Sequence, residues 1–324
     1  MAKISGTQAI AEAIAIEMRR DPKVILEGID VTELGGAFGQ YQGLYAEFGA
    51  DRVIDTPISE AGYTGAGVGL AMSGIPTIVE IEQGDFTSVA FDAIVNQAAK
   101  MRYLNDGRVT IPLTVVAAHG ARTMFGAQHS QSVESWYTNA AGLKIVVPTS
   151  AADMKGLMAA AVRDPDPVLY LPYKAGLFMP SEVPEGEYVV PIGKGNVVKE
   201  GKDLTIIAWQ GGLFCAQMAL AELAKEGIDA ELIDLRSIVP YDKDLIAQSV
   251  SKTGRAMIVH EAPLRGGFGG EIAAYIADAC YDKLKAPVKR LGGANIPFSF
   301  GGIEEAFYPQ IPDIVKTAVS MVKG

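Results

Sequence analysis

Short apolar runs rich in β-branched residues alternate with helical patterns along most of this 324-residue chain. The runs lie at residues 24–27, 77–81, 113–117, 144–147, 168–171, 205–208, 231–234 and 256–260. Helical periodicity separates most of them, at residues 6–19, 88–103, 151–163, 213–225 and 269–281. Strands that are apolar on both faces and separated by helices are typical of a parallel sheet covered on both sides. The sequence therefore predicts an α/β fold.

A segment at residues 173–203 interrupts this alternation. It contains Pro180, Pro184 and Pro191 together with several glycines and charged residues, a composition typical of an extended connection. The length of the chain is sufficient for two domains of ordinary size. We expect a parallel-sheet first domain, a linker with the entry to the second domain, and a smaller α/β second domain, at residues 1–185, 186–203 and 204–324, respectively.

Charge and hydropathy exclude several classes of partner. The formal net charge of −10 and the pI near 4.9 disfavour binding to nucleic acid or to anionic membranes. No run of about 18 apolar residues is present, as a membrane span would require. The start of the sequence lacks the pattern of a secretory signal, and Cys215 and Cys280 lie in apolar helical patterns, where we expect free core thiols. These features predict a cytoplasmic protein.

The polar stretch FGAQHSQSVESWY, at residues 125–137, contains His129, one of three histidines. It has almost no helical or strand periodicity. Since imidazole titrates near neutrality, such a loop can present an acid/base group to a substrate. The alternative is a solvated loop with an incidental histidine, and the segment alone does not separate the two.

A second unusual segment is DTPISEAGYTGAGVGLAMSG, at residues 55–74. Its glycines interrupt an otherwise helical pattern, and each costs roughly 0.5–1 kcal/mol relative to alanine, so close approach of another backbone or of a bound ring is expected. Glu60 stands near the start of this helix. It is either a carboxylate that caps the helix or a partly buried carboxylate aimed at a ligand nitrogen, and the local sequence supports both readings equally.

Two other features have a simpler structural interpretation. The glycine-rich segment 266–270 follows a predicted strand and opens a helix, but its spacing is not that of a dinucleotide-binding loop, so we expect tight strand-to-helix packing. His260 and Glu261 stand at a strand end, where a catalytic role is one interpretation; we expect a hydrogen-bonded structural pair instead. No cysteine and histidine cluster has the spacing of a structural zinc site.

Taken together, several segments resemble the β subunits of the thiamine diphosphate-dependent 2-oxo acid dehydrogenases of the pyruvate, branched-chain and acetoin types, within the transketolase-like superfamily. The matching segments include GIDV at 28–31, FGADRVIDTPISEAG at 48–62, GDFTSVAFDAIVNQAAKMRY at 84–103, AQHSQS at 127–132 and VHEAPLRGGFGGEIAA at 259–274. They occur in the family's order over nearly the whole chain. The resemblance implies a pyrimidine-binding domain followed by a transketolase C-terminal-type domain.

The resemblance also implies a partner. In the family, the α subunit binds the cofactor's diphosphate through Mg²⁺, using a motif that runs from Gly-Asp-Gly to Asn. Here Gly84 and Asp85 are followed by Phe86, and no other segment fits. The chain is therefore expected to supply only the pyrimidine half of the site, to be active only with an α subunit in an α2β2 heterotetramer, and to serve a lipoyl-bearing dihydrolipoyl acyltransferase.

The family's residue roles transfer to matching positions. Glu60 would hydrogen-bond the aminopyrimidine ring nitrogen and promote the imino tautomer, Phe86 would pack against the pyrimidine face, and His129 would face the substrate and the arriving lipoyl group. The resemblance also implies a potassium site built largely from backbone carbonyls, a ligation that leaves little side-chain signature. Its residues are Leu113, Ala161, Val162, Asp164 and Asp166.

Three departures from the family pattern stand out. Ile29 replaces an acidic residue near the cofactor that is implicated in proton communication between paired sites. Met124 stands where an arginine is frequent before the histidine, and residues 172–174 read Pro-Tyr-Lys instead of Glu-His-Lys. These changes predict a more apolar substrate side.

Three functions follow. The first is the β subunit of a 2-oxo acid or acetoin dehydrogenase that passes an acyl group to lipoamide. The second is a split transketolase-like carboligase or acyloin-cleaving enzyme that does not use lipoamide. The third is a non-catalytic interaction subunit, which the presence of Glu60, Phe86 and His129 disfavours. Specificity depends on side chains of both subunits, so this sequence alone names no substrate.

Overall fold

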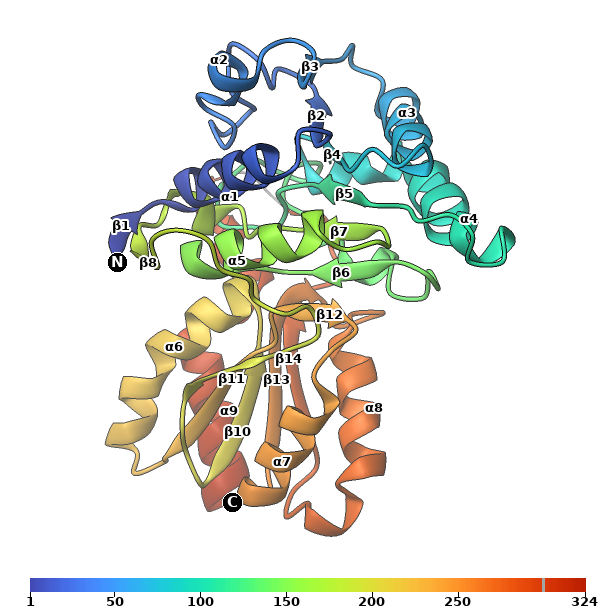
Figure 1. Ribbon diagram of the computed structural model, residues 1–324. Coiled ribbons are helices and arrows are strands. Elements are labelled where there is room, and N and C mark those ends of the chain that lie inside the picture. Colours follow the sequence, from blue (N-terminus) through green and yellow to red (C-terminus); the bar gives the residue numbers. More distant parts are fainter. Residues whose placement is uncertain (299–300) are drawn as a thin grey trace. The chain divides into compact units, whose positions relative to one another are not determined.

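The computed structural model describes residues 1–298 and 301–324, and the chain divides into two compact units (Figure 1). The first unit comprises Met1–His119 and Trp136–Ile192, and the second comprises Gly120–Ser135 and Gly193–Gly324. Each unit has helices around a mostly parallel sheet, so the predicted fold class is confirmed. Within the described ranges, no helix has both the length and the apolar character needed to cross a membrane.

The sheet of the first unit has the strand order β6-β7-β5-β4-β2-β3, and the pairings among these strands are parallel. All five apolar runs predicted in this part of the chain form strands. The strands are β2 (Ile25–Gly28), β3 (Val53–Asp55), β4 (Thr77–Glu80), β5 (Leu113–Val116), β6 (Lys144–Val146) and β7 (Val168–Tyr170). A separate antiparallel pair joins β1 (Ala2–Ile4) to β8 (Ser181–Val183).

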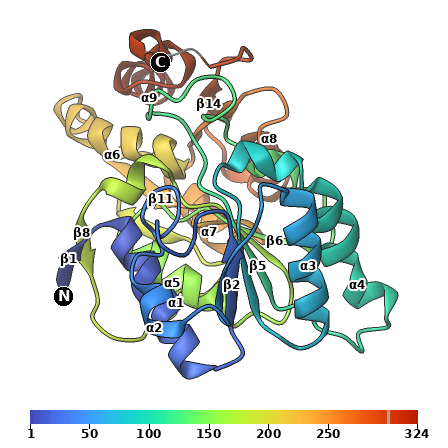
Figure 2. The same cartoon turned by 90° about the horizontal axis from the view of Figure 1, so that it is seen from above.

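Helices cover both faces of this sheet. Figure 2 shows α1 (Gly6–Arg20) and α5 (Ala151–Val162) on one side and α3 (Glu60–Met72) and α4 (Ala99–Leu104) on the other. Helix α1 begins with a capping box in which Ser5 and Gln8 satisfy each other's backbone N–H groups. The shorter elements are α2 (Leu44–Phe48), η3 (Glu134–Trp136) and η4 (Ala175–Phe178).

The helix predicted at residues 88–103 is broken into three pieces. They are the 3₁₀ turn η1 (Gly84–Ser88), the π-helical η2 (Ala93–Ala98) and α4. In η1, the hydroxyls of Thr87 and Ser88 donate to the carbonyls of Gly84 and Asp85 at 2.6 and 2.8 Å. Such side-chain bonds to nearby backbone compete with regular helix formation, which explains why the α-helical pattern starts late.

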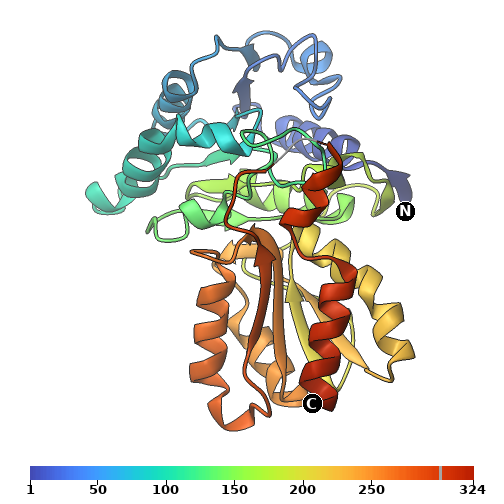
Figure 3. The same cartoon turned by 180° about the vertical axis from the view of Figure 1, so that it is seen from behind.

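The second unit has the strand order β14-β13-β10-β11-β9, with β9 antiparallel to β11. Helices α6 and α9 contact each other and share one apolar core with the sheet. Helix α7 contacts α8 (Figure 3). Cys215 and Cys280 are buried and free, as expected. The elements are β9 (Asn196–Lys199), β10 (Leu204–Ala208), α6 (Gln210–Lys225), β11 (Ala230–Asp234), β12 (Ser237–Val239), α7 (Lys243–Thr253), β13 (Ala256–Pro263), α8 (Gly269–Ala279), η5 (Tyr281–Lys283), β14 (Lys289–Gly293), η6 (Gly301–Phe307) and α9 (Ile311–Lys323).

Candidate active site

Three of the predicted site residues follow adjacent strands of the first unit. Ile29 comes directly after β2, Glu60 comes after β3, and Phe86 comes after β4, and these strands lie in the order β4-β2-β3. Because the strands are parallel, their carboxyl ends meet at one edge of the sheet, the usual place for a ligand in open α/β folds. The structure therefore brings Ile29, Glu60 and Phe86 to the same edge.

Glu60 is the first residue of α3 and is 9% exposed. The N-cap residue, Ser59, makes no side-chain capping bond, and its hydroxyl donates instead to the Pro57 carbonyl at 3.3 Å. Among the described residues, the Glu60 carboxylate has no hydrogen bond to a first-turn amide or to another side chain. No capping hydrogen bond therefore supports the capping interpretation of Glu60. The start of α3 instead places a nearly buried carboxylate at the edge of the sheet.

The glycines of α3 fall into two groups. A Cβ on Gly67 would lie 2.5 Å from Val79 Cγ2 and 2.8 Å from Glu27 Oε1, so this glycine lets the helix approach β2 and β4 closely. A Cβ on Gly65 or Gly69 would meet nothing within 4 Å. Packing inside this unit therefore explains Gly67 and leaves the outer glycine face of α3 open.

Two buried carboxyls, one in β2 and one in β4, were not predicted. Burial raises the pKa of Glu27 to about 7, and its Oε1 has no hydrogen-bond partner among the described residues. Burial also raises the pKa of Glu80 to about 8, even though its carboxylate accepts hydrogen bonds from Gln40 Nε2 at 2.8 Å and from the Tyr41 hydroxyl. Each is therefore substantially protonated near neutral pH. Their positions in apolar strands were the only sequence signal.

The fourth predicted site residue, His129, belongs to the second unit. It is half-buried, and its backbone N–H donates to the Gly126 carbonyl at 3.3 Å, which closes a turn just before the imidazole-bearing residue. The polar stretch singled out in the sequence therefore contains a turn at residues 126–129. Its residues 125–135 belong to the second unit, and Trp136 and Tyr137 belong to the first.

A buried cluster lies at the far end of this segment. Glu134 Oε1 accepts a hydrogen bond from Trp209 Nε1 at 3.1 Å, and burial raises the pKa of Glu134 to about 7. The Trp209 ring stacks on His260, with ring centroids 5.1 Å apart. Burial lowers the pKa of His260 to about 4, so this imidazole is neutral at physiological pH.

The expected pair between His260 and Glu261 is wrong. Consecutive residues of β13 point to opposite faces of the sheet, so His260 packs on Trp209 whereas Glu261 accepts a hydrogen bond from Arg122. The glycine-rich segment does serve tight packing, as predicted. A Cβ on Gly267 or Gly269 would lie 2.8 or 2.6 Å from the His260 ring.

The residues of the predicted potassium site gather at the opposite, amino-terminal edge of the first sheet. Leu113 begins β5, Ala161 and Val162 end α5, and the two aspartates follow. Lys144 Nζ donates to both oxygens of Asp164 at 2.6 and 2.7 Å, and Arg102 donates to Asp166 at 2.5 Å. The carboxylates are thus neutralised by side-chain cations, and no group of three or more potential metal-binding His, Cys, Asp or Glu occurs in the described chain.

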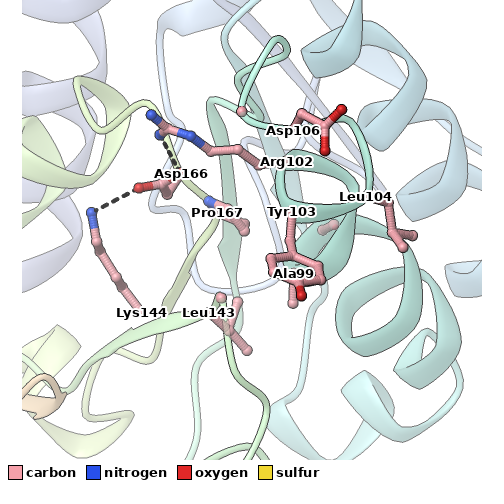
Figure 4. Close-up of a pocket in the computed structure, with 12 residues that line it drawn as sticks. Ala99, Arg102, Tyr103, Leu104, Asp106, Leu143, Lys144, Asp166 and Pro167 are labelled. Atoms are coloured by element: carbon pink, nitrogen blue, oxygen red, sulfur yellow. Dashed lines mark hydrogen bonds and ion pairs between the residues drawn. The ribbon is translucent and has the colours of Figure 1, made fainter.

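Figure 4 shows a pocket of about 830 Å³ at this same edge. Arg102, Lys144 and Asp166 form its charged side, and the 84%-exposed Tyr103 stands at its rim. Lys144 is the first residue of β6 and Pro167 directly precedes β7, so the pocket lies at the end of the sheet opposite to Glu60. It is therefore separate from the candidate active site.

Comparisons with known proteins decide the family. Residues 2–175 match the transketolase pyrimidine-binding domain, and residues 193–314 match the transketolase C-terminal domain. A mitochondrial pyruvate dehydrogenase E1 β subunit from Oryza sativa is 41% identical over 96% of this chain and 84% of its own length. The chain belongs to the β subunits of the 2-oxo acid dehydrogenases. The resemblance drawn from the sequence is confirmed.

Other members of this family are equally similar. The acetoin:2,6-dichlorophenolindophenol oxidoreductase β subunit of Bacillus subtilis is 41% identical over 99% of this chain and 97% of its own length. The 2-oxoisovalerate dehydrogenase β subunit of the same organism is 41% identical over 98% of both chains. Identity therefore does not separate three different substrates.

Solved structures support the fold. A split-gene transketolase described as an inactive β4 tetramer superimposes with a TM-score of 0.79 at 23% identity, covering 99% of both chains. A transketolase from Campylobacter jejuni gives a TM-score of 0.72 at 14% identity, over 98% of this chain and 47% of the other. The 47% coverage means that this chain matches about half of the length of the Campylobacter jejuni transketolase chain.

Proposed function

We propose that this chain supplies the pyrimidine half of a thiamine diphosphate site in an α2β2 2-oxo acid or acetoin dehydrogenase. Residues 1–185 would form the pyrimidine-binding domain and residues 204–324 the C-terminal domain. The α subunit would hold the diphosphate and most of the Mg²⁺ coordination. The observation that carries the proposal is the nearly buried Glu60 carboxylate at the carboxyl edge of the sheet, without an internal partner in the described chain.

The side chains at this edge suit the aminopyrimidine ring. Glu60 supplies a carboxylate with little access to water, Phe86 supplies a half-buried aromatic face, and Ile29 supplies an apolar wall. A carboxylate in such surroundings can hold a proton at a ring nitrogen because the charge it compensates is poorly solvated. When bound, thiamine diphosphate provides the carbanion that attacks a 2-oxo carbonyl. Glu60 would orient the ring and exchange the proton at its nitrogen.

The decisive test is hydrogen exchange at the thiazolium C2 in the complex reconstituted with its α subunit. We expect Glu60→Ala and Glu60→Gln to slow this exchange by at least about 100-fold, the usual scale for loss of an acid/base group. Glu222→Gln is the control, because Glu222 is an exposed carboxylate on α6 that pairs with Lys225 at 2.7 Å. A wild-type exchange rate in both Glu60 variants would rule out the proposed role.

His129 would act later, on the acyl-transfer step. The disulfide of an oxidised lipoyl group accepts the two electrons of this step: its S–S bond breaks, one sulfur bonds the acyl group and the other leaves as a thiolate. A half-buried imidazole in a turn can donate a proton to that leaving sulfur. His129→Ala should therefore lower transfer to a lipoyl domain by more than it lowers decarboxylation measured with an artificial electron acceptor. Equal losses in the two assays would contradict this role.

A second candidate function differs from the first in its acyl acceptor. The runner-up is a carboligase or acyloin-cleaving enzyme of the split transketolase type, which would not use lipoamide. One relative carries dichlorophenolindophenol in its name, so reduction of that dye by itself does not separate the two. Purified lipoyl domain does, because only the leading function predicts its acylation from pyruvate, a branched-chain 2-oxo acid or acetoin.

We further propose a cytoplasmic location for the protein. We also propose a potassium ion near Asp164 and Asp166. Since Lys144 and Arg102 neutralise both carboxylates, backbone carbonyls would have to supply the ligands. The complex would then show a higher melting temperature in potassium chloride than in choline chloride. Equal melting temperatures would remove potassium from the proposal without affecting Glu60.

A further inference from the structure

The backbone that leads to His129 has an unusual conformation. In the strap formed by residues 120–126, every second residue is left-handed: Gly120, Arg122, Met124 and Gly126 have φ values of 96°, 71°, 58° and 80°. Two of them carry a Cβ, for which this region is sterically unfavourable. Alternation of handedness turns successive backbone N–H groups toward a common point and creates a concavity that suits an anion.

A carboxylate of the same chain fills this concavity. Glu304, on η6, accepts a hydrogen bond from the Arg122 N–H at 3.0 Å through one oxygen and from the Met124 N–H at 2.9 Å through the other. The side chain is 2% exposed, so these charge-assisted bonds are made away from bulk water. Glu304 thus holds both left-handed side-chain-bearing residues of the strap.

A second carboxylate secures the start of the strap. Glu261 Oε2 accepts from the Ala121 N–H at 3.2 Å, and Glu261 Oε1 accepts from Arg122 Nε at 2.9 Å. The Arg122 guanidinium lies 4.0 Å above the Tyr308 ring, which belongs to the segment that follows η6. Strand β13 and the η6 segment therefore hold the strap from two sides.

The strap is coupled directly to the turn that carries His129. The last left-handed residue, Gly126, accepts the His129 N–H at 3.3 Å. A backbone rotation at Met124 would therefore be passed over two peptide units to the turn and would redirect the imidazole. Strained backbone persists only where its surroundings over-determine it, and the two carboxylates supply that constraint.

We propose that Glu304 is a positioning residue for acyl transfer, because its carboxylate holds the 120–126 strap in the conformation that presents His129. The inference rests on the function proposed above for His129. It adds a structural claim about the strap that can be measured without any activity.

The structural arm measures amide hydrogen exchange in the full-length chain. In Glu304→Gln, an NH2 group replaces one of the two accepting oxygens and cannot accept a hydrogen bond, so one of the amides of Arg122 and Met124 loses its partner. We expect peptides covering residues 121–126 to exchange roughly tenfold faster, the equivalent of one lost hydrogen bond. Strand β10 (Leu204–Ala208) reports whether the fold is intact, and Glu305→Gln is the matched control because Glu305 is the exposed neighbour. Unchanged exchange in the strap of Glu304→Gln would overturn the proposal.

The functional arm uses the complex reconstituted with its α subunit. Glu304→Gln should lower acyl transfer to a lipoyl domain more than decarboxylation, whereas Glu305→Gln should leave both unchanged. Adding Met124→Gly should restore part of the transfer, because glycine adopts the left-handed conformation without the clamp and the Met124 side chain is 58% exposed. A merely structural role predicts no such rescue.

The outcomes separate this proposal from the role of His129. Faster strap exchange with unchanged transfer in Glu304→Gln would overturn the positioning role. Full transfer in His129→Ala would instead remove the function on which the inference rests, and it would do so whatever the exchange result for Glu304→Gln. If Glu304→Gln does not fold, Glu304→Asp, which keeps both oxygens on a shorter stem, serves for the same comparison.

Discussion

Arg122 and Glu261 form a largely buried ion pair, with Arg122 Nε 2.9 Å from Glu261 Oε1 and the two side chains 17% and 3% exposed. The same guanidinium donates to Cys215 Sγ at 2.9 Å. Burial alone would raise the pKa of Glu261, and Arg122 opposes that rise by stabilising the charged form. The pair therefore joins the strap before His129 to strand β13 and helix α6.

The first prediction follows from this burial. Arg122→Met should lower the free energy of unfolding by about 3 kcal/mol, because it leaves Glu261 buried without its counter-charge. Adding Glu261→Gln should recover part of the loss. Arg19→Met is the control, since Arg19 pairs with Glu47 at 2.6 Å on the surface, where such a pair contributes less than about 1 kcal/mol. Urea unfolding measures all four proteins, and equal losses for Arg122→Met and Arg19→Met would show that burial adds nothing.

A second prediction concerns pH. Burial raises the pKa of Glu134 from 4.5 to about 7, so the folded chain holds this proton more tightly than the unfolded chain does. The resulting stabilisation is complete below pH 4.5 and is lost as the pH rises through about 7, a change on the order of 3 kcal/mol.

Glu134→Gln removes this titration while its amide oxygen can still accept from Trp209. The stability of the variant relative to the wild type should therefore increase between pH 5 and pH 7.5. Glu27, Glu80 and His260 titrate equally in both proteins and cancel in this comparison. Urea unfolding at the two pH values tests the prediction, and Glu222→Gln, at an exposed site, should show no such increase. If the free energies of unfolding of Glu134→Gln and wild type differ by the same amount at both pH values, the raised pKa of Glu134 is contradicted.

The local sequence pattern was sufficient to predict the central strands of both sheets, but it did not predict the edge strands β9 and β14. Runs such as 113–117 are apolar on both faces because helices cover both faces, so composition alone reveals them. Strands β9 and β14 lie at the edges of the second sheet, and β14 carries the exposed Lys289 and Arg290. Charged residues of this kind protect edge strands from further pairing and make them resemble loops in a sequence.

The candidate site also has a part that the sequence predicted and a part that it did not. Glu60, Phe86 and His129 came from segments that match a family, and the structure adds that Glu60 and Phe86 share one sheet edge with Ile29. The clamp on the strap was not predictable, because Glu304 is 182 residues from Arg122 in sequence and no periodicity reports such a contact. The mistaken pairing of His260 with Glu261 has the same origin, since adjacency in sequence means opposite faces in a strand.

The third prediction compares two glycines of α3 in the isolated chain. Gly67→Ala should lower the free energy of unfolding by about 1–2 kcal/mol, because the new methyl group would meet Val79 and Glu27 at 2.5 and 2.8 Å. Gly65→Ala should raise it by up to about 1 kcal/mol, because alanine favours the helix and nothing lies within 4 Å of its Cβ. The midpoints of thermal and urea unfolding should thus fall for Gly67→Ala and rise for Gly65→Ala. Midpoints that move in the same direction in both variants would contradict the difference in packing between the two glycines.

The fourth prediction concerns the space around His260. A Cβ on Gly269 would lie 2.6 Å from His260 Nε2 and 3.2 Å from Ile258 Cγ2, and the stack on Trp209 prevents the imidazole from moving away. Gly269→Ala should therefore lower the free energy of unfolding by about 1–3 kcal/mol, the usual cost of overpacking. Gly270→Ala is the control, because its nearest neighbour is Arg290 Nη1 at 3.3 Å, the end of a flexible side chain. In the double variant His260→Ala/Gly269→Ala, the vacated space accommodates the methyl group, so the two losses should sum to more than the loss of the double variant. Strictly additive losses would mean that the imidazole and residue 269 do not compete for the same space.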